Sequence, residues 1–132
     1  MGFTWSFKTR FAHEFSNYPR DQQDKILDFI ALLTQHGLTD FGKFSGKFSA
    51  SWKGLASSDP AYAHARSNEL WHYHIGIPRY RNTRGKDQTS DWILHFQWPH
   101  KNAGGTHIDL VDICYHYKAD GSFYLPAAGY LL

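Results

Sequence analysis

The sequence predicts a single α+β domain in which an N-terminal strand and two helices pack on one face of an antiparallel β-sheet. Three observations support this prediction. Aromatic residues alternate with polar ones at residues 3–9, a helical periodicity ends at Gly37, and strand-like segments follow residue 68. A chain of 132 residues fits one domain, 1–132, and can bury a core of its own.

The N-terminal segment predicts a half-buried strand followed by a short helix. Phe3, Trp5 and Phe7 fall on one side of an extended chain, and polar residues fall on the other. Phe11 and Phe15 are four residues apart, which is the spacing of one helical face.

The clearest helix extends from Pro19, in its first turn, to His36. Its apolar residues recur at helical spacing: Ile26, Phe29, Ile30 and Leu33. Gly37 follows as the expected C-terminal stop. Residues 38–69 indicate a strand or an ordered loop, with a loop or a frayed helical turn at 56–67.

Leu70–Ile77 alternates as a strand, which places His72 and His74 on one face and Trp71, Tyr73 and Ile75 on the other. Pro78 ends this strand, and a polar loop is expected at 79–90.

Two further strands follow the polar loop. Trp92–Trp98 has His95 on the face opposite its large apolar side chains. His107–Tyr117 is almost entirely apolar or aromatic, as a strand covered on both faces would be.

Composition indicates a folded intracellular protein. Aromatic residues make up 17% of the chain, and the one cysteine, Cys114, cannot form an internal disulfide. Cys114 is expected to be a small core residue rather than a nucleophile. No signal peptide and no membrane-spanning segment is recognisable.

The positive charge is concentrated in the middle of the chain. Residues 43–101 hold nine Lys or Arg against four Asp or Glu, a net +5, whereas the whole chain carries +2. Such a segment is either a solvated surface or the contact surface for an anionic partner.

His72 and His74 allow three interpretations. Their imidazoles could bind one metal ion, with a third ligand from His95, Asp112 or His116. They could instead line a polar face that meets an anionic substrate, or they could be ordinary polar positions on an open sheet face.

The end of the last strand combines groups suited to RNA cleavage. His116 can act as a general acid or base, Tyr117 and Tyr124 can stack or donate hydrogen bonds, and Lys118 can hold a phosphate. Such cleavage needs no metal, because the 2′-hydroxyl of the RNA can be the nucleophile.

The order of elements resembles the RelE/ParE superfamily of bacterial toxins, above all its ribosome-dependent mRNA interferases of the RelE, YoeB and HigB type. The resemblance covers a leading aromatic strand, a helix ending in HG at 36–37, LWHYHI at 70–75 and IDLVDICYHYK at 108–118. It implies a curved antiparallel sheet of RelE-like form.

The resemblance also implies site residues. His116 and Tyr117 match a catalytic His-Tyr pair, Arg81 of the PRYR segment matches a functional arginine, and Tyr124 matches a C-terminal tyrosine. Substrate-binding positions are then His72, His74, Lys118, Lys43 and Lys47. The chain would be a cytoplasmic endoribonuclease without metal or cofactor, which cleaves mRNA on the ribosome and is bound by a cognate antitoxin.

Two alternatives come from other classes of protein. A ParE-like member would poison DNA gyrase without cleaving RNA, since one fold serves both activities. A small metal-dependent enzyme of cupin type would use His72, His74 and a later histidine.

Overall fold

The computed structural model describes residues 3–77, 79–84, 87–99, 101, 104–115 and 124–132. Its helices are α1 (Thr9–Phe15), α2 (Arg20–His36) and α3 (Pro60–Ser67), with 3-10 turns η1 (Phe41–Lys43) and η3 (Ala128–Leu131). Its strands are β1 (Thr4–Phe7), β2 (Phe48–Ala50), β3 (Leu70–His74), β4 (Arg81–Arg84), β5 (Asp87–Thr89), β6 (Trp92–Gln97) and β7 (His107–Tyr115). The α+β class predicted from the sequence is confirmed.

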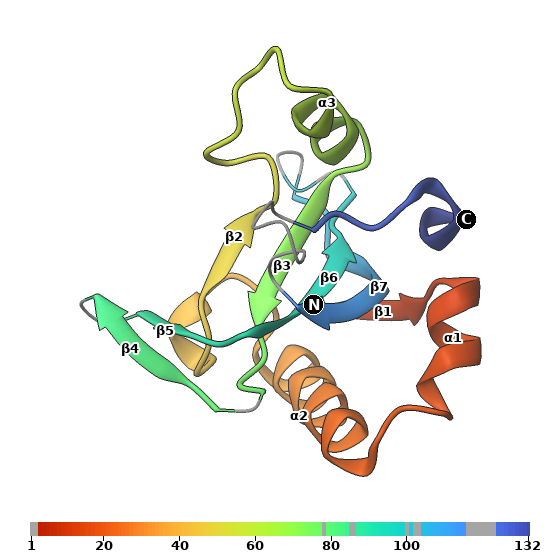
Figure 1. Ribbon diagram of the computed structural model, residues 1–132. Helices are drawn as coiled ribbons and strands as arrows, with labels where there is room; N and C mark the ends of the chain where they lie inside the picture. Colours follow the sequence, from red (N-terminus) through yellow and green to blue (C-terminus); the bar gives the residue numbers. More distant parts are fainter. Residues whose placement is uncertain (1–2, 78, 85–86, 100, 102–103, 116–123) are drawn as a thin grey trace.

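Five strands form one open sheet in the order β1-β7-β6-β3-β2, with β1 and β2 as its edges (Figure 1). The pairs β2–β3, β3–β6 and β6–β7 are antiparallel, whereas β1 runs parallel to β7. The sheet is therefore mixed, and it does not curl, so the expectation of a curved and wholly antiparallel sheet is wrong. A parallel pair needs a long connection rather than a hairpin, and here the helices α1 to α3 and the strands β2 to β6 separate β1 from β7 along the chain.

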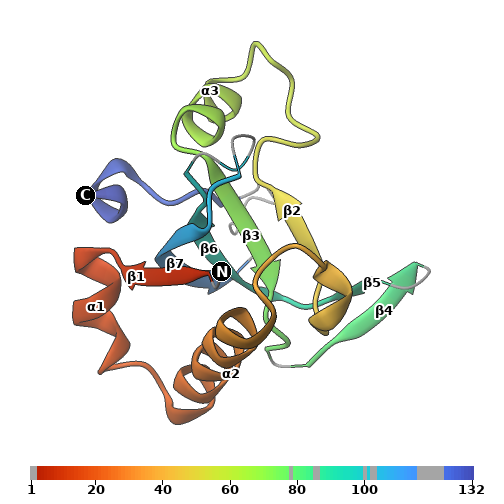
Figure 2. The same cartoon turned by 180° about the vertical axis from the view of Figure 1, so that it is seen from behind.

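Helix α2 packs against one face of the sheet and forms the centre of the core (Figure 2). The four residues expected on its apolar face are the buried ones: Ile26, Phe29, Ile30 and Leu33. Phe29 is 2% exposed, and its ring lies 5.1 Å from Tyr73 and 6.2 Å from Phe96 between ring centroids. The predicted helix and its stop at Gly37, which has φ +66°, are confirmed.

The N-terminal prediction is confirmed as well. The ring of Phe7 on β1 lies 4.8 Å from Phe11 and 5.3 Å from Phe15 on α1. These aromatic contacts hold the short helix against the β1 edge of the sheet.

Two segments differ from the sequence prediction. Residues 60–67 form the helix α3, because Asp59 caps it by accepting a hydrogen bond from the Ala61 N–H at 2.9 Å and Pro60 occupies its first turn. The prediction of a polar loop at 79–90 is wrong for β4 and β5. The backbones of these two strands pair as a hairpin that is separate from the main sheet. The sequence did not show this hairpin, because its strands RNTR and DQT are polar and carry no apolar alternation.

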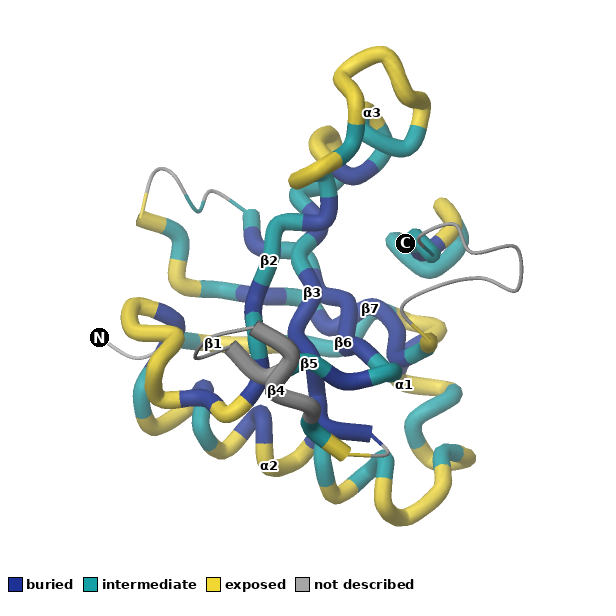
Figure 3. Tube along the Cα trace, turned by 60° about the vertical axis from the view of Figure 1, so that its left-hand side comes forward, coloured by how far each residue is buried: buried dark blue, intermediate teal, exposed yellow. Residues whose placement is uncertain are grey.

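Burial follows these layers (Figure 3). Buried residues are concentrated in the central strands and on the inner side of α2, whereas α3 and the loops around it are mostly exposed. No helix in the described part of the chain is both long and apolar enough to cross a membrane.

Candidate functional site

The face of the sheet opposite α2 holds a line of buried polar side chains. The strand register pairs His72 on β3 with His95 on β6, and His95 with Asp112 on β7. His72 is 6% exposed, Asp112 5% and His95 0%. His72 and His74 lie on this face and Tyr73 on the other, as the alternation predicted.

The aromatic rings on this face are near neighbours. Ring centroids of His72 lie 5.9 Å from His74 and 6.2 Å from His95, and His95 lies 5.8 Å from Tyr124. Tyr124 comes from the C-terminal segment, so it joins the strand histidines only through tertiary packing. We call His72, His74, His95, Asp112 and Tyr124 the histidine cluster.

Asp112 is the carboxylate of the histidine cluster. Its Oδ2 accepts a hydrogen bond from the Tyr124 hydroxyl at 2.9 Å, and its Oδ1 accepts one from the Ile113 N–H at 2.8 Å. Burial raises the pKa of Asp112 to about 6, with Glu14 adding to the rise and the two hydrogen bonds opposing it. A carboxyl group with this pKa can take up or release a proton near neutral pH.

The two histidines of β3 are held by neighbouring serines. His72 Nδ1 lies 3.0 Å from Ser51 Oγ. The Ser90 backbone N–H donates to His74 Nδ1 at 3.0 Å. Burial lowers the pKa of His74, the backbone hydrogen bond with Ser90 opposes this shift, and the charge of Lys47 adds to it, so the neutral imidazole is favoured.

Asp112→Asn is expected to change how stability depends on pH. Because the pKa of Asp112 is raised from 3.8 to about 6, its ionisation favours the unfolded chain, and stability present below pH 4 is lost as pH rises through 6. The loss is about 3 kcal/mol, and the asparagine side chain of the variant cannot ionise. Relative to wild type, the free energy of unfolding of the variant should rise by about 3 kcal/mol between pH 4 and pH 7.

Urea unfolding of both proteins at several pH values measures this difference. The lowered pKa of His74 acts in the opposite direction, since its stability contribution is lost as pH falls, but it is common to both proteins and cancels. A difference between the two proteins that stays constant from pH 4 to pH 7 would contradict the prediction.

Residues that follow Tyr124 in the sequence also hold the C-terminal segment in place, through contacts with two helices. His64 Nε2 on α3 lies 2.7 Å from the carbonyl oxygen of Pro126. The Tyr130 hydroxyl donates to Glu14 on α1 at 3.0 Å, and the Arg10 guanidinium lies 5.1 Å from the Tyr130 ring centroid. Both ends of this segment are thus tied to helices.

Of the other predicted site residues in the described part of the chain, the structure brings only Lys47 to the histidine cluster. The backbone N–H of His74 donates to the Lys47 carbonyl at 3.0 Å, which brings Lys47 to the histidine cluster. Lys43 is exposed on η1, and no contact among the described residues brings it to the histidines. Arg81 lies in β4, with its side chain outside the description. The predicted residues His116, Tyr117 and Lys118 lie outside the described residues.

A second polar group joins β1 to β7 and was missed in the sequence. His107 Nδ1 lies 2.7 Å from Thr4 Oγ1, and its Nε2 lies 3.2 Å from Ser6 Oγ and 3.1 Å from Asp109 Oδ1. The Ser6 hydroxyl donates directly to Asp109. Since one histidine nitrogen faces both the serine and the carboxylate, this is not the arrangement of a nucleophilic triad. The sequence did not show this group, because it depends on the parallel pairing of β1 with β7, two strands that are distant in the chain.

Metal binding has no support in the described part of the chain. None of its His, Cys, Asp and Glu residues form groups of three or more that could hold an ion. The sheet is also open, unlike the closed sheet of a cupin. Cys114 is partly buried, and burial raises the pKa of its thiol, which disfavours the nucleophilic thiolate.

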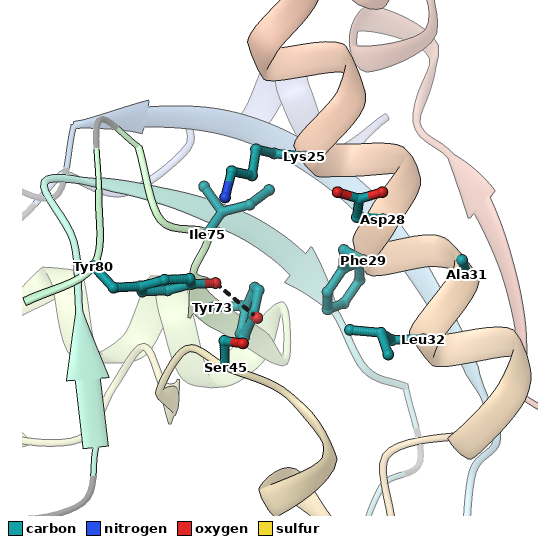
Figure 4. A pocket seen from close by; sticks show the side chains of 9 residues that line it. All are labelled: Lys25, Asp28, Phe29, Ala31, Leu32, Ser45, Tyr73, Ile75 and Tyr80. Atoms are coloured by element: carbon teal, nitrogen blue, oxygen red, sulfur yellow. Dashed lines mark hydrogen bonds between the residues drawn. The ribbon is translucent and has the colours of Figure 1, made fainter.

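A pocket of about 400 Å³ lies on the other side of the sheet, between α2 and β3 (Figure 4). Phe29, Tyr73 and Ile75 form its buried apolar wall, and Lys25 lies at its rim, 5.5 Å from the Tyr80 ring centroid. The hydroxyls of Tyr73 and Tyr80 are 3.0 Å apart. Because the sheet separates this pocket from the histidine cluster, the two do not form one site.

Comparison with known proteins gives no relative for this chain. No protein-family model, no curated protein sequence and no solved structure matches it. The class shown by the structure is therefore an α+β fold with an open mixed sheet, and the function has to be argued from the site.

Proposed function

We propose that this protein is the toxin of a type II toxin–antitoxin system and acts as a metal-independent endoribonuclease on mRNA, with a RelE-like fold. The observation that carries the proposal is the histidine cluster, whose Asp112 lies on β7 four residues before His116 in the sequence. Asp112, with a pKa of about 6, accepts a hydrogen bond from Tyr124, and His116, Tyr117 and Lys118 stand between β7 and Tyr124 in the sequence.

The proposed reaction is an internal transesterification. A general base takes the proton of the RNA 2′-hydroxyl, the 2′-oxygen forms a bond to phosphorus, and the bond from phosphorus to the 5′-oxygen breaks. A general acid protonates the leaving 5′-oxygen, which gives a 2′,3′-cyclic phosphate and a 5′-hydroxyl. One proton leaves the 2′-hydroxyl and one is added to the 5′-oxygen, so the step balances without an oxidant or a reductant.

In this proposal His116 is the general acid or base and Arg81 stabilises the charge on the phosphate. Tyr117 stacks on or orients a base, and Asp112 with Tyr124 holds the end of β7 in place. Lys47 and Lys118 add positive charge for the RNA, whereas His74, which is only 6% exposed, positions its neighbours.

The order of elements supports the proposal. A strand and two helices come first along the chain, and antiparallel strands follow, with α3 between β2 and β3. The basic middle segment suits an anionic partner. The partners would be mRNA on the ribosome and an antitoxin that covers the toxin, with the complex in the cytoplasm.

Burial of the histidines favours a second candidate. His72 and His95 are almost inaccessible, so their role here is to position neighbours rather than to touch RNA. A protein in which the whole cluster is structural would act by binding, as a ParE-like inhibitor of DNA gyrase does.

Induced expression of wild type and His116→Ala in a bacterial host tests the proposal. Growth arrest with new mRNA 5′ ends is expected for wild type, and at least a hundredfold fewer such ends for His116→Ala, because general acid–base catalysis contributes roughly 10²–10⁴-fold. The matched control is His13→Ala, which removes an exposed histidine from α1 and should leave arrest and cleavage unchanged.

The alternatives give different results. A folded His116→Ala variant that still cleaves mRNA would remove the assignment of His116. Arrest with intact mRNA and an induced DNA-damage response would replace the nuclease proposal with gyrase inhibition.

A further inference from the structure

Three tryptophans and two cations lie against one another. One of the cations comes from α3, the helix next to one end of β3 in Figure 1. The five residues come from three separate stretches of the sequence, and none was predicted as a site residue. We call Trp52, Trp71, Trp98, Arg66 and Lys101 the tryptophan–cation surface.

The rings of the tryptophan–cation surface form a continuous row. Trp52 and Trp71 have centroids 6.0 Å apart in an edge-to-face arrangement, and Trp71 and Trp98 have centroids 5.4 Å apart. Trp98 is buried, whereas Trp52 and Trp71 are each partly exposed. Trp52 and Trp71, the first two rings of the row, therefore present aromatic surface to solvent at one end of the sheet.

Each cation lies against these rings. The Arg66 guanidinium is 4.9 Å from the Trp52 ring centroid. The Lys101 ammonium is 5.3 Å from Trp71 and 5.1 Å from Trp98. Such contacts restrict a long side chain to one region while leaving its charge in place.

No carboxylate neutralises either cation in the part of the chain that the structure describes. The ion pairs found there involve other basic residues, namely Lys8, Arg20 and His107. Both cations also belong to the basic segment 43–101. Two positioned positive charges thus flank a row of aromatic rings with no internal counter-ion among the described residues.

We propose that the tryptophan–cation surface binds single-stranded RNA, with phosphates on Arg66 and Lys101 and bases against Trp52 and Trp71. This proposal rests on the proposed function, for which it supplies a path for the substrate outside the histidine cluster. Aromatic rings next to positive charge are the combination by which proteins hold single strands without reading their sequence. A duplex keeps its bases stacked inside, so it offers only its phosphates to this surface.

The test measures binding of the full-length protein to a fluorescein-labelled 12-nucleotide oligouridine by fluorescence anisotropy over a series of salt concentrations. Arg66→Gln and Lys101→Gln should each weaken binding about fivefold and lower the slope of log affinity against log salt by about 0.7. Trp52→Leu should weaken binding about tenfold, because stacking is lost.

The matched control is Arg20→Gln, which removes one charge from an 88% exposed side chain on α2 and should leave binding unchanged. Circular dichroism of every variant verifies that it is folded. Quenching of tryptophan fluorescence by the oligonucleotide should also decrease in Trp52→Leu, which a purely structural role of Trp52 would not produce.

The proposal would be overturned if the wild type did not bind the oligouridine at low salt, or if Arg20→Gln weakened binding as much as Arg66→Gln. Tighter binding of duplex RNA, or of DNA with the matching sequence, than of the oligouridine would also overturn it. Because binding is measured without cleavage, its outcome is independent of His116. Binding through this surface with no cleavage in cells would refute the nuclease while leaving the RNA surface in place.

Discussion

Replacing Phe29 by alanine is expected to lower the free energy of unfolding by about 4 kcal/mol, because the ring lies at the centre of the core between α2 and the sheet. It contacts rings from three other parts of the chain: Phe44, Phe48, Tyr73 and Phe96. Truncation removes these contacts and leaves a cavity that the backbones of α2 and the sheet cannot fill.

Chemical denaturation of Phe29→Ala and wild type measures the loss. Leu27→Ala is the control, because Leu27 is on the same helix but 51% exposed, and its replacement should cost less than about 0.5 kcal/mol. Similar losses for the two variants would show that α2 does not pack through the face described.

Replacing Gly46 by alanine should be as damaging, for the opposite reason. A Cβ at Gly46 would lie 1.8 Å from the carbonyl oxygen of His74 and 2.9 Å from the Tyr73 ring. The backbone of β3 cannot move aside cheaply, so we expect a loss of about 3 kcal/mol or more. The hydrogen bond from the Gly46 N–H to the Tyr73 hydroxyl, at 3.1 Å, would also be disturbed.

Gly54→Ala is the control for Gly46→Ala. Gly54 has φ +86°, but a Cβ there meets no atom within 4 Å, so only the backbone strain of about 1 kcal/mol is expected. Thermal unfolding of both variants compares the two costs. A Gly46→Ala protein as stable as Gly54→Ala would mean that residue 46 does not lie against β3.

Gly46 also matters for the proposed site. Its neighbour Lys47 pairs with the end of β3, where His74 is held by Ser90. A displaced residue 46 should therefore reduce the proposed activity along with stability, whereas Gly54→Ala should leave the activity unchanged.

Local patterns in the sequence predicted most of the individual elements. The periodicity of Ile26, Phe29 and Leu33 placed α2, because a helix brings residues three and four apart onto one face. The alternation of His72 and Tyr73 placed them on opposite faces of β3, because successive side chains of a strand point to opposite sides. The hairpin β4–β5 was missed, since its polar residues carry no such signal.

By itself, then, the sequence determined the α+β class, the face of each strand and the presence of titratable groups near the end of β7, all of which depend on neighbours along the chain. Only the tertiary structure decided that β1 runs parallel to β7, that His72, His95 and Asp112 line up across three strands, and that Tyr124 meets them. It also decided that Arg66 and Lys101 meet the tryptophans. Such contacts depend on strand register and on segments that are distant in the chain, and the periodicity of one segment does not encode its alignment with another.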